Sequence, residues 1–534
     1  MAEDNSGISA GFIHIDIHKM AFCKDFPLWI RWITYYPHVE KRGITEADIS
    51  WYAEFSTTKY GNYPHSSTDI HHYSHHAGKW APMITDMEHE AMISPETRAF
   101  VKAHRSEDVR ELALKTKPMD GLDLPQALDQ IAGWQIARKK LPEWAECDGI
   151  IYPPHIAMEQ CSSQFTARYK AEIADRLLHA DADHAGDPAQ SEAGVAKTAC
   201  SMETERTGEQ GTKESSVRRT GPTMADLTGG FGVDCSYLAR GFTHATYVER
   251  QSHLCGLAAH NMAVLGLRQV EVVCGDGIEY LRSMQPVSLI YMDPARRDEH
   301  GARTYAMQDC TPDVLALRDA LLAKARFVMV KLSPMLDWRK AVTDFDGAVT
   351  QVHIVSTGNE CKELLLVLDG AAGTGRLRNG MRAPRVYCVN DDQRIDYDSA
   401  AYTRGLRIGT APLPEMKYLY EPNASIMKAG CFDLLEERYG VTQIGPSSHL
   451  FVADEPVTDF PGRGFAVEAI GGMGKRDVRR LLGGVRQANI AVRNFPLTAS
   501  QLRNRLKLAD GGDTYLFGTT TQEGGHILLR TVKL

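Results

Sequence analysis

A glycine-rich turn directly after a short apolar run is the first feature that could carry chemistry. It spans residues 226–232, and a helical stretch around Tyr237 follows it. Glycines between a strand and a helix permit a tight turn and let the backbone approach a ligand closely. We therefore expect this turn to bind a ligand through Asp226, Thr228, Gly229, Gly230 and Gly232.

Acidic residues recur at the ends of the next apolar runs. Glu249 closes the second run, Asp276 follows the third, and Asp293 follows the fourth. A carboxylate at the end of the second strand can accept hydrogen bonds from both hydroxyls of a ribose. The carboxyl ends of successive strands in an open α/β sheet line one crevice, so we expect these side chains to face a common ligand.

Short β-branched runs alternate with helical stretches through this part of the chain. The candidate strands are Met224–Leu227, Ala245–Val248, Val270–Val273, Val287–Met292, Phe327–Val330, Val352–Val355 and Leu364–Leu368. This alternation is typical of a parallel sheet with helices on both faces. The sequence therefore predicts an α/β fold for residues 221–370.

With these motifs in this order, residues 221–370 resemble the class I S-adenosylmethionine-dependent methyltransferases. The resemblance implies a Rossmann-like sheet and S-adenosylmethionine as the cofactor. It also implies that the turn passes the methionine moiety, that Glu249 holds the ribose, and that Asp276 meets the adenine. A dinucleotide-binding dehydrogenase is disfavoured, because the turn departs from the GxGxxG spacing.

The motif after the fourth strand bears on the methyl acceptor. Amino methyltransferases of nucleic acids carry an acid or amide, two prolines and an aromatic residue at this place. Here Asp293 and Pro294 match, but Ala295 and Arg296 replace the second proline and the aromatic. We interpret Asp293 and Pro294 as orienting a base nitrogen, with Arg296 and Lys331 as further catalytic candidates. Arg296 either contacts the RNA by stacking or phosphate binding, or pairs with a nearby carboxylate.

Other acceptors fit the sequence less well. Methylation of a pyrimidine carbon needs a cysteine nucleophile, and no cysteine lies beside Lys331 at the end of the fifth run. One family of ribose 2′-oxygen methyltransferases uses an aspartate, two lysines and a glutamate. Asp293, Lys331 and Glu363 match part of that set, but the sequence shows no convincing first lysine. A base nitrogen in tRNA or rRNA is therefore the favoured acceptor.

Residues 471–508 carry nine cations against Asp477 alone, a local net charge of +8. A glycine turn at 471–474 precedes the first of these cations, and helix N-termini with adjacent cations bind phosphate well. We expect this tail to contact RNA. The candidate RNA-binding residues are Lys475, Arg476, Arg479, Arg480, Arg493 and Arg503.

The tail resembles the THUMP-like domain of a bacterial methyltransferase family of unassigned specificity, and residues 418–428 resemble the ferredoxin-like segment of that family. Before the sheet, N-cap signals at Ser94 and Asp123 predict helices, the last beginning near Met158 and running through Ile173. The predicted parts are an N-terminal His- and aromatic-rich extension of unknown fold (1–90), a helical domain (91–178), a flexible linker (179–220), the methyltransferase domain (221–370), a ferredoxin-like connecting segment (371–445) and a THUMP-like domain (446–534).

Composition narrows the class of protein. The net charge is −8, and the 11 cysteines contain no CxxC pair, which favours a reducing cytoplasm over a disulfide framework or a zinc site. No apolar stretch is long enough to cross a membrane. For the clustered His72 and His76 we favour a solvated loop over a metal site. No obligate protein partner is predicted. Two rival functions stay open: a small-molecule or protein methyltransferase, and a non-catalytic RNA-binding protein.

Overall fold

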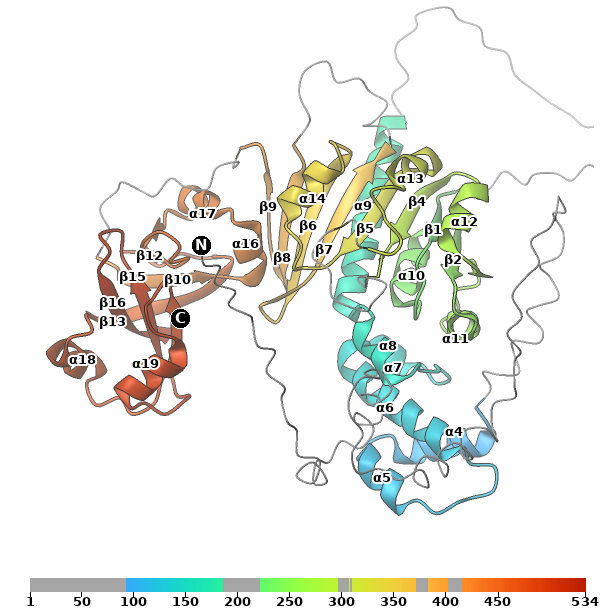
Figure 1. Ribbon diagram of the computed structural model, residues 1–534, viewed down its shortest axis with the longest axis horizontal. Helices are drawn as coiled ribbons and strands as arrows, with labels where there is room; N and C mark the ends of the chain where they lie inside the picture. The colour runs from blue at the N-terminus through green and yellow to red at the C-terminus, as the bar shows by residue number, and fades with distance from the viewer. Residues whose placement is uncertain (1–92, 186–220, 296–306, 308–309, 371–382, 402–414) are drawn as a thin grey trace, which may run out of the picture. The chain divides into compact units, whose positions relative to one another are not determined.

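The computed structural model describes residues 93–185, 221–295, 307, 310–370, 383–401 and 415–534 (Figure 1). All of them belong to one compact unit. The predictions for the His-rich start and for Arg296 lie outside the described residues. No helix among the described residues is long and apolar enough to cross a membrane.

Helices precede the first sheet, as predicted. They are α4 (Pro95–His104), α5 (Val109–Lys115), α6 (Leu124–Lys140), α7 (Pro142–Glu146), α8 (His155–Gln160) and α9 (Gln164–Ala185). The predicted N-caps are confirmed, because Ser94 Oγ accepts from Thr97 N at 3.1 Å and Asp123 Oδ1 accepts from Gln126 N at 3.0 Å. These bonds satisfy amides that the first helical turn leaves unpaired.

Helices α8 and α9 differ from the prediction in two ways. The single helix expected from Met158 through Ile173 is broken at residues 161–163. Ser163 Oγ accepts from Thr166 N at 3.3 Å, so a serine that competes for backbone groups starts a second helix there. Helix α9 also continues to Ala185, so residues 179–185 are helical, although we predicted that the linker begins at residue 179.

Nine strands form the first sheet, and every predicted strand is present. They are β1 (Thr223–Asp226), β2 (His244–Glu249), β3 (Val270–Cys274), β4 (Val287–Met292), β5 (Ala325–Leu332), β6 (Val349–Thr357), β7 (Glu360–Asp369), β8 (Arg385–Asn390) and β9 (Gln393–Asp398), in the order β3-β2-β1-β4-β5-β7-β6-β8-β9. The sheet is mixed: the five strands β3, β2, β1, β4 and β5 run parallel to one another, whereas β7 is antiparallel to both β5 and β6. The amino end of β7 therefore lies beside the carboxyl end of β5.

Helices cover both faces of this sheet. On one face, α9 and α10 (Val233–Leu238) pack against alternate strand residues such as Met224 and Leu289. On the other face, α12 (Gly277–Ser283), α13 (Arg318–Lys324) and α14 (Trp338–Asp344) pack against Ala225 and Ile290. Helix α11 (Ser252–Val264) packs beside α10 against Tyr247. The alternation follows from the two-residue period of strand side chains.

A second sheet of seven strands forms the C-terminal part. Its order is β11 (Thr442–Gln443), β12 (Phe451–Ala453), β10 (Tyr418–Pro422), β13 (Gly462–Gly471), β16 (His526–Lys533), β15 (Thr514–Thr520) and β14 (Asn489–Arg493). Helices α18 (Lys475–Leu482) and α19 (Ala499–Leu506) cover one face through Leu481 and Leu502.

Two further helices, α16 (Ala424–Ala429) and α17 (Phe432–Tyr439), share a core with the first sheet. The indole of Trp338 donates to Ala429 O at 3.3 Å. Strands β8 and β9 belong to the first sheet, although we placed their residues in the ferredoxin-like connecting segment.

Candidate active site

A cavity of about 2070 Å³ opens at the carboxyl ends of β1, β2, β4 and β5. The structure brings all the described candidate cofactor and catalytic residues to it. They are Asp226, Thr228, Gly229, Gly230, Gly232, Glu249, Asp276, Asp293, Pro294 and Lys331. The candidate RNA-binding residues of the C-terminal part do not line this cavity.

The glycine turn needs its glycines for two different reasons. Gly230 and Gly232 have φ of +55° and +85°, which side-chain-bearing residues rarely adopt. A Cβ on Gly229 would lie 2.2 Å from Cε2 of the buried Tyr247. The same tyrosine donates its hydroxyl to Gly230 O, so β2 fixes the turn through its side chains.

Glu249 holds the turn from the end of β2. Its Oε2 accepts from Gly230 N at 2.9 Å, and its Oε1 accepts from Gln251 N at 2.9 Å. The carboxylate therefore lies at the rim of the cavity with its orientation fixed by two backbone amides. It can still accept further hydrogen bonds, because each carboxylate oxygen has more than one lone pair.

Asp226 lies at the base of the turn, and its side chain is buried. Its Oδ1 accepts from Thr228 N at 3.0 Å. Burial raises the pKa of Asp226 to about 8, and the nearby carboxylates of Asp234 and Asp293 add to this effect. Thr228 Oγ1 in turn accepts from Asp293 N at 2.6 Å, which joins the turn to the end of β4.

Asp276 caps helix α12 at the end of β3. Its Oδ1 accepts from Ile278 N at 2.8 Å and from Glu279 N at 3.2 Å, and these bonds leave Oδ2 for another partner. A Cβ on the next residue, Gly277, would lie 2.2 Å from Leu227 O. This close approach of two backbones keeps the third strand end beside the glycine turn.

Asp293 and Lys331 form an ion pair in the cavity lining, at the carboxyl ends of β4 and β5. Lys331 Nζ donates to Asp293 Oδ2 at 2.5 Å. Burial alone would lower the pKa of Lys331, but Asp293, Asp234 and Glu363 outweigh it and raise that pKa. Lys331 is therefore an ammonium at neutral pH.

Two residues that the sequence did not reveal complete this group of charges. Lys170, fully buried on α9, donates to Asp234 Oδ1 at 3.0 Å and to Glu363 Oε2 at 2.8 Å. Asp234, at the start of α10, also accepts from Ser162 Oγ at 2.8 Å and from Tyr291 Oη at 2.7 Å. Lys170 could have been noticed in the sequence, because it lies on the side of α9 whose other residues are mostly apolar and buried.

The pKa shifts of the two buried carboxyls differ in direction. Burial would raise the pKa of Asp234, but Lys170 and Lys331 lower it. Burial raises the pKa of Glu363 despite the same two lysines. Glu363 Oε1 is buried without a hydrogen-bond partner, whereas all the charged oxygens of Asp234 are paired.

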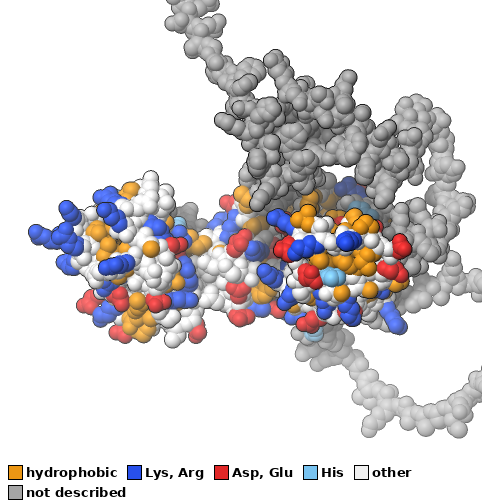
Figure 2. Space-filling view, turned by 90° about the horizontal axis from the view of Figure 1, so that it is seen from below, with side chains coloured by type: hydrophobic (Ala, Val, Ile, Leu, Met, Phe, Trp, Pro, Cys, Tyr) orange, Lys and Arg blue, Asp and Glu red, His pale blue; other side chains and the backbone are white. Residues whose placement is uncertain are grey.

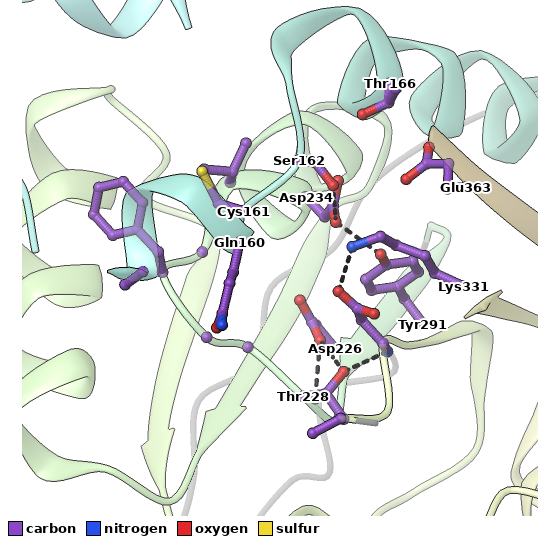
Figure 3. A pocket seen from close by; sticks show the side chains of 18 of the residues that line it. Gln160, Cys161, Ser162, Thr166, Asp226, Thr228, Asp234, Tyr291, Lys331 and Glu363 are labelled. Carbon is purple, nitrogen blue, oxygen red and sulfur yellow. Dashed lines mark hydrogen bonds and ion pairs between the residues drawn. The ribbon is translucent and has the colours of Figure 1, made fainter. Parts of the chain in front are cut away.

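The break between α8 and α9 supplies one wall of the cavity. Gln160, Cys161, Ser162 and Thr166 line it together with residues of the sheet (Figure 3). Figure 3 shows Ser162, Asp234 and Lys331 close together. The helical region before the sheet is therefore part of the candidate site.

The predicted RNA-binding residues fall into two groups. Lys475, Arg476, Arg479 and Arg480 are exposed on helix α18, and only Asp477 opposes them there. Figure 2 shows Lys and Arg side chains gathered at the left of the view, over the part that carries α18 in Figure 1.

Arg493 and Arg503 bind within the protein instead. Arg493 donates to the buried Glu421 at 2.8 Å, and Arg503 donates to Ala488 O and Ala509 O, both at 3.0 Å. Because the protein itself uses their guanidinium groups, these two arginines support the local fold.

The chain is similar to known proteins over its C-terminal part and over most of its length. A ferredoxin-like domain model matches residues 418–461, and a THUMP-like domain model matches residues 462–533. The crystal structure of a proposed methyltransferase from Porphyromonas gingivalis W83 aligns with a TM-score of 0.64 at 27% identity, covering 82% of this chain and 97% of that chain. The chain is also 25% identical to an uncharacterized S-adenosylmethionine-dependent methyltransferase of Mycobacterium tuberculosis, in strains CDC 1551 / Oshkosh and ATCC 25618 / H37Rv. The aligned 294 residues are 54% of this chain and 75% of that protein.

Proposed function

We propose that this protein methylates RNA. The chain belongs to the S-adenosylmethionine-dependent methyltransferases with ferredoxin-like and THUMP-like C-terminal domains, and we infer the reaction from this family. The observation that carries the proposal is one cavity that joins the candidate cofactor residues to a partly exposed Asp293–Lys331 pair. The RNA classes that we propose are cytoplasmic tRNA and rRNA.

The cofactor fits the side chains of the strand ends. S-adenosylmethionine, when bound, supplies a methyl group on a positively charged sulfur. Glu249 has the fixed carboxylate that a ribose diol needs, and Asp276 has an unused Oδ2 for an adenine amino group. The turn around Gly229 and Gly230 leaves room for the methionine moiety beside the Asp226 carboxyl.

RNA contact is proposed for helix α18. Its four exposed cations can reach phosphates, and such contacts fix the orientation of RNA without reading its sequence. The THUMP-like match over residues 462–533 includes this helix. We therefore assign RNA positioning to α18 and chemistry to the cavity.

The acceptor predicted from the sequence is a base nitrogen oriented by Asp293 and Pro294. In the structure, Asp293 Oδ2 accepts a hydrogen bond from Lys331, and Oδ1 takes no part in this ion pair. Asp293 can thus still receive a hydrogen bond from an acceptor group. The ammonium beside it is a feature that the amino-methyltransferase motif does not include.

Deleting the gene and comparing modified nucleosides in total tRNA and rRNA by mass spectrometry tests this function. We expect one methylated nucleoside to disappear and to return when the wild-type gene is restored. If every methylated nucleoside persists, RNA methylation is wrong, and a small-molecule or protein substrate or a non-catalytic RNA-binding role takes its place.

A further inference from the structure

Five charged residues gather at the acceptor end of the cavity, here called the lysine–carboxylate cluster. Its members are Lys170, Asp234, Asp293, Lys331 and Glu363. They come from α9, α10, the end of β4, β5 and β7. Ion pairs join three of them through Lys170 and the other two to each other, and the two sets interact electrostatically. The antiparallel direction of β7 is what brings Glu363 to the same edge of the sheet as Lys331.

Asp293 and Lys331 are the members of the cluster that face the cavity most openly. Their side chains are 38% and 14% exposed, whereas those of Asp234, Glu363 and Lys170 are 10%, 3% and 0% exposed. An incoming acceptor group therefore meets a carboxylate oxygen and an ammonium side by side. Asp234 and Glu363 line the cavity beside them with little exposure, and Lys170 lies behind the lining.

An ammonium at this position distinguishes oxygen from nitrogen acceptors. An amino nitrogen that attacks a methyl group becomes positively charged before it loses its proton, and the charge of Lys331 opposes this. A hydroxyl oxygen gains negative character as its proton leaves, and a fixed ammonium stabilises that character. The charge beside Asp293 therefore favours a hydroxyl acceptor.

Among the described residues, no aromatic side chain is placed to stack on a base beside Asp293. The Phe and Tyr side chains that line the cavity there are Phe165, Tyr169, Phe231 and Tyr291. Three of them are buried, and Phe165 packs against the core of the first sheet. None of these rings stands free to hold a flipped base beside Asp293, as an amino methyltransferase requires.

We propose that the acceptor is a ribose 2′-hydroxyl of RNA, bound between Asp293 and Lys331; this rests on the proposed RNA methylation. The hydroxyl oxygen forms a bond to the methyl carbon while its proton passes to Oδ1 of Asp293. The carbon–sulfur bond breaks, and its electron pair stays on the sulfur, which becomes neutral. Asp293 then gives its proton to water, and Lys331 donates a hydrogen bond to the acceptor oxygen throughout.

Lys170 and Glu363 are positioning residues in this scheme. Glu363 contributes negative charge behind Lys331, which keeps that side chain charged, and Lys170 fixes Glu363 by an ion pair of 2.8 Å. Replacing Glu363 with Gln preserves its shape and removes the charge. We expect kcat to fall while KM for RNA stays the same, and a purely structural residue would not produce this split.

Alkaline hydrolysis tests the acceptor directly. The full chain is incubated with total RNA from the deletion strain and with S-adenosylmethionine labelled in its methyl group. Alkali cleaves RNA only beside a free 2′-hydroxyl, so we expect the label in alkali-resistant dinucleotides. Label in mononucleotides with a methylated base would overturn the hydroxyl acceptor and leave RNA methylation intact. Unlabelled RNA would overturn both.

Substitutions test the two residues that contact the acceptor. Asp293→Asn and Lys331→Ala should each lower kcat by about a hundredfold or more, with unchanged affinity for S-adenosylmethionine. Lys331→Arg keeps the charge and should recover part of the rate. Lys340→Ala, an exposed lysine on α14, is the matched control. Rates equal to this control, or loss of cofactor binding in both variants, would contradict the assignment.

Discussion

The ammonium of Lys170 on α9 lies 2.8 Å from the carboxylate of Glu363 on β7, and neither side chain reaches solvent appreciably. The two residues are 193 positions apart in the sequence, so this pair joins the helical region to the catalytic sheet. Removing one partner of a buried ion pair strands the other charge without water or a counterion.

Lys170→Met should therefore lower the free energy of unfolding by about 3–5 kcal/mol. Chemical denaturation followed by tryptophan fluorescence measures this change. Lys102→Met is the control, because the Lys102–Asp148 pair is exposed and should contribute little. Equal stability of the two variants would mean that the buried pair does not hold the helical region.

Asp226 predicts a pH dependence of stability. Its pKa is about 8 when folded against 3.8 as the ordinary value, so the folded state binds an extra proton between these pH values. Stability should fall as the pH rises from about 4 to 8, and Asp226→Asn should remove this part of the fall. Calorimetric melting of both proteins at pH 5 and pH 8 checks it. A difference that does not grow with pH would show that Asp226 titrates normally.

Glu249→Ala should weaken S-adenosylmethionine binding by about ten- to a hundredfold, because charge-assisted hydrogen bonds are each worth about 1.5–3 kcal/mol. The substitution also frees Gly230 N, which Glu249 holds at 2.9 Å. Isothermal calorimetry measures the affinity. Glu271→Ala is the control, since this side chain is exposed on β3 and pairs with His244 there. Unchanged affinity in Glu249→Ala would exclude it from the cofactor site.

Gly229→Ala should abolish cofactor binding or unfold the turn, since its Cβ would meet the ring of Tyr247 at 2.2 Å. Gly241→Ala places its Cβ in open space and should behave like the wild type. Calorimetric affinity and melting temperature of the two variants separate these outcomes. A well-folded, cofactor-binding Gly229→Ala protein would disprove the close packing.

Reversing charges on α18 should weaken RNA binding in a salt-dependent way. Each phosphate contact that is lost lowers the slope of log affinity against log salt by about one. Arg476→Glu combined with Arg479→Glu should flatten this slope, as filter binding at several salt concentrations can show. Lys102→Glu combined with Lys340→Glu changes the total charge by the same amount at exposed sites outside α18 and is the control. The same slope in both proteins would remove α18 from the RNA interface.

The first sheet and its glycine turn were predictable, because alternation of apolar residues and turn glycines are local patterns. Glu249 and Asp276 reach the cavity for the same reason, since strand ends meet at one edge. Lys170 could not be paired from sequence, because its partners lie on α10 and β7 and only the folded chain joins them. The pairing of Arg493 with Glu421 could not be predicted either, because the two residues are 72 positions apart in the sequence.

Side-chain contacts among the described residues join the cavity wall of α8 and α9 to the first sheet. The ion pairs of Lys170 and the packing of Tyr169 and Ile173 are among these contacts. A fragment that begins at residue 221 would keep the strands of the first sheet but lose this wall, and it would leave Asp234 and Glu363 without the ammonium of Lys170. The α/β sheet alone is therefore smaller than the catalytic unit.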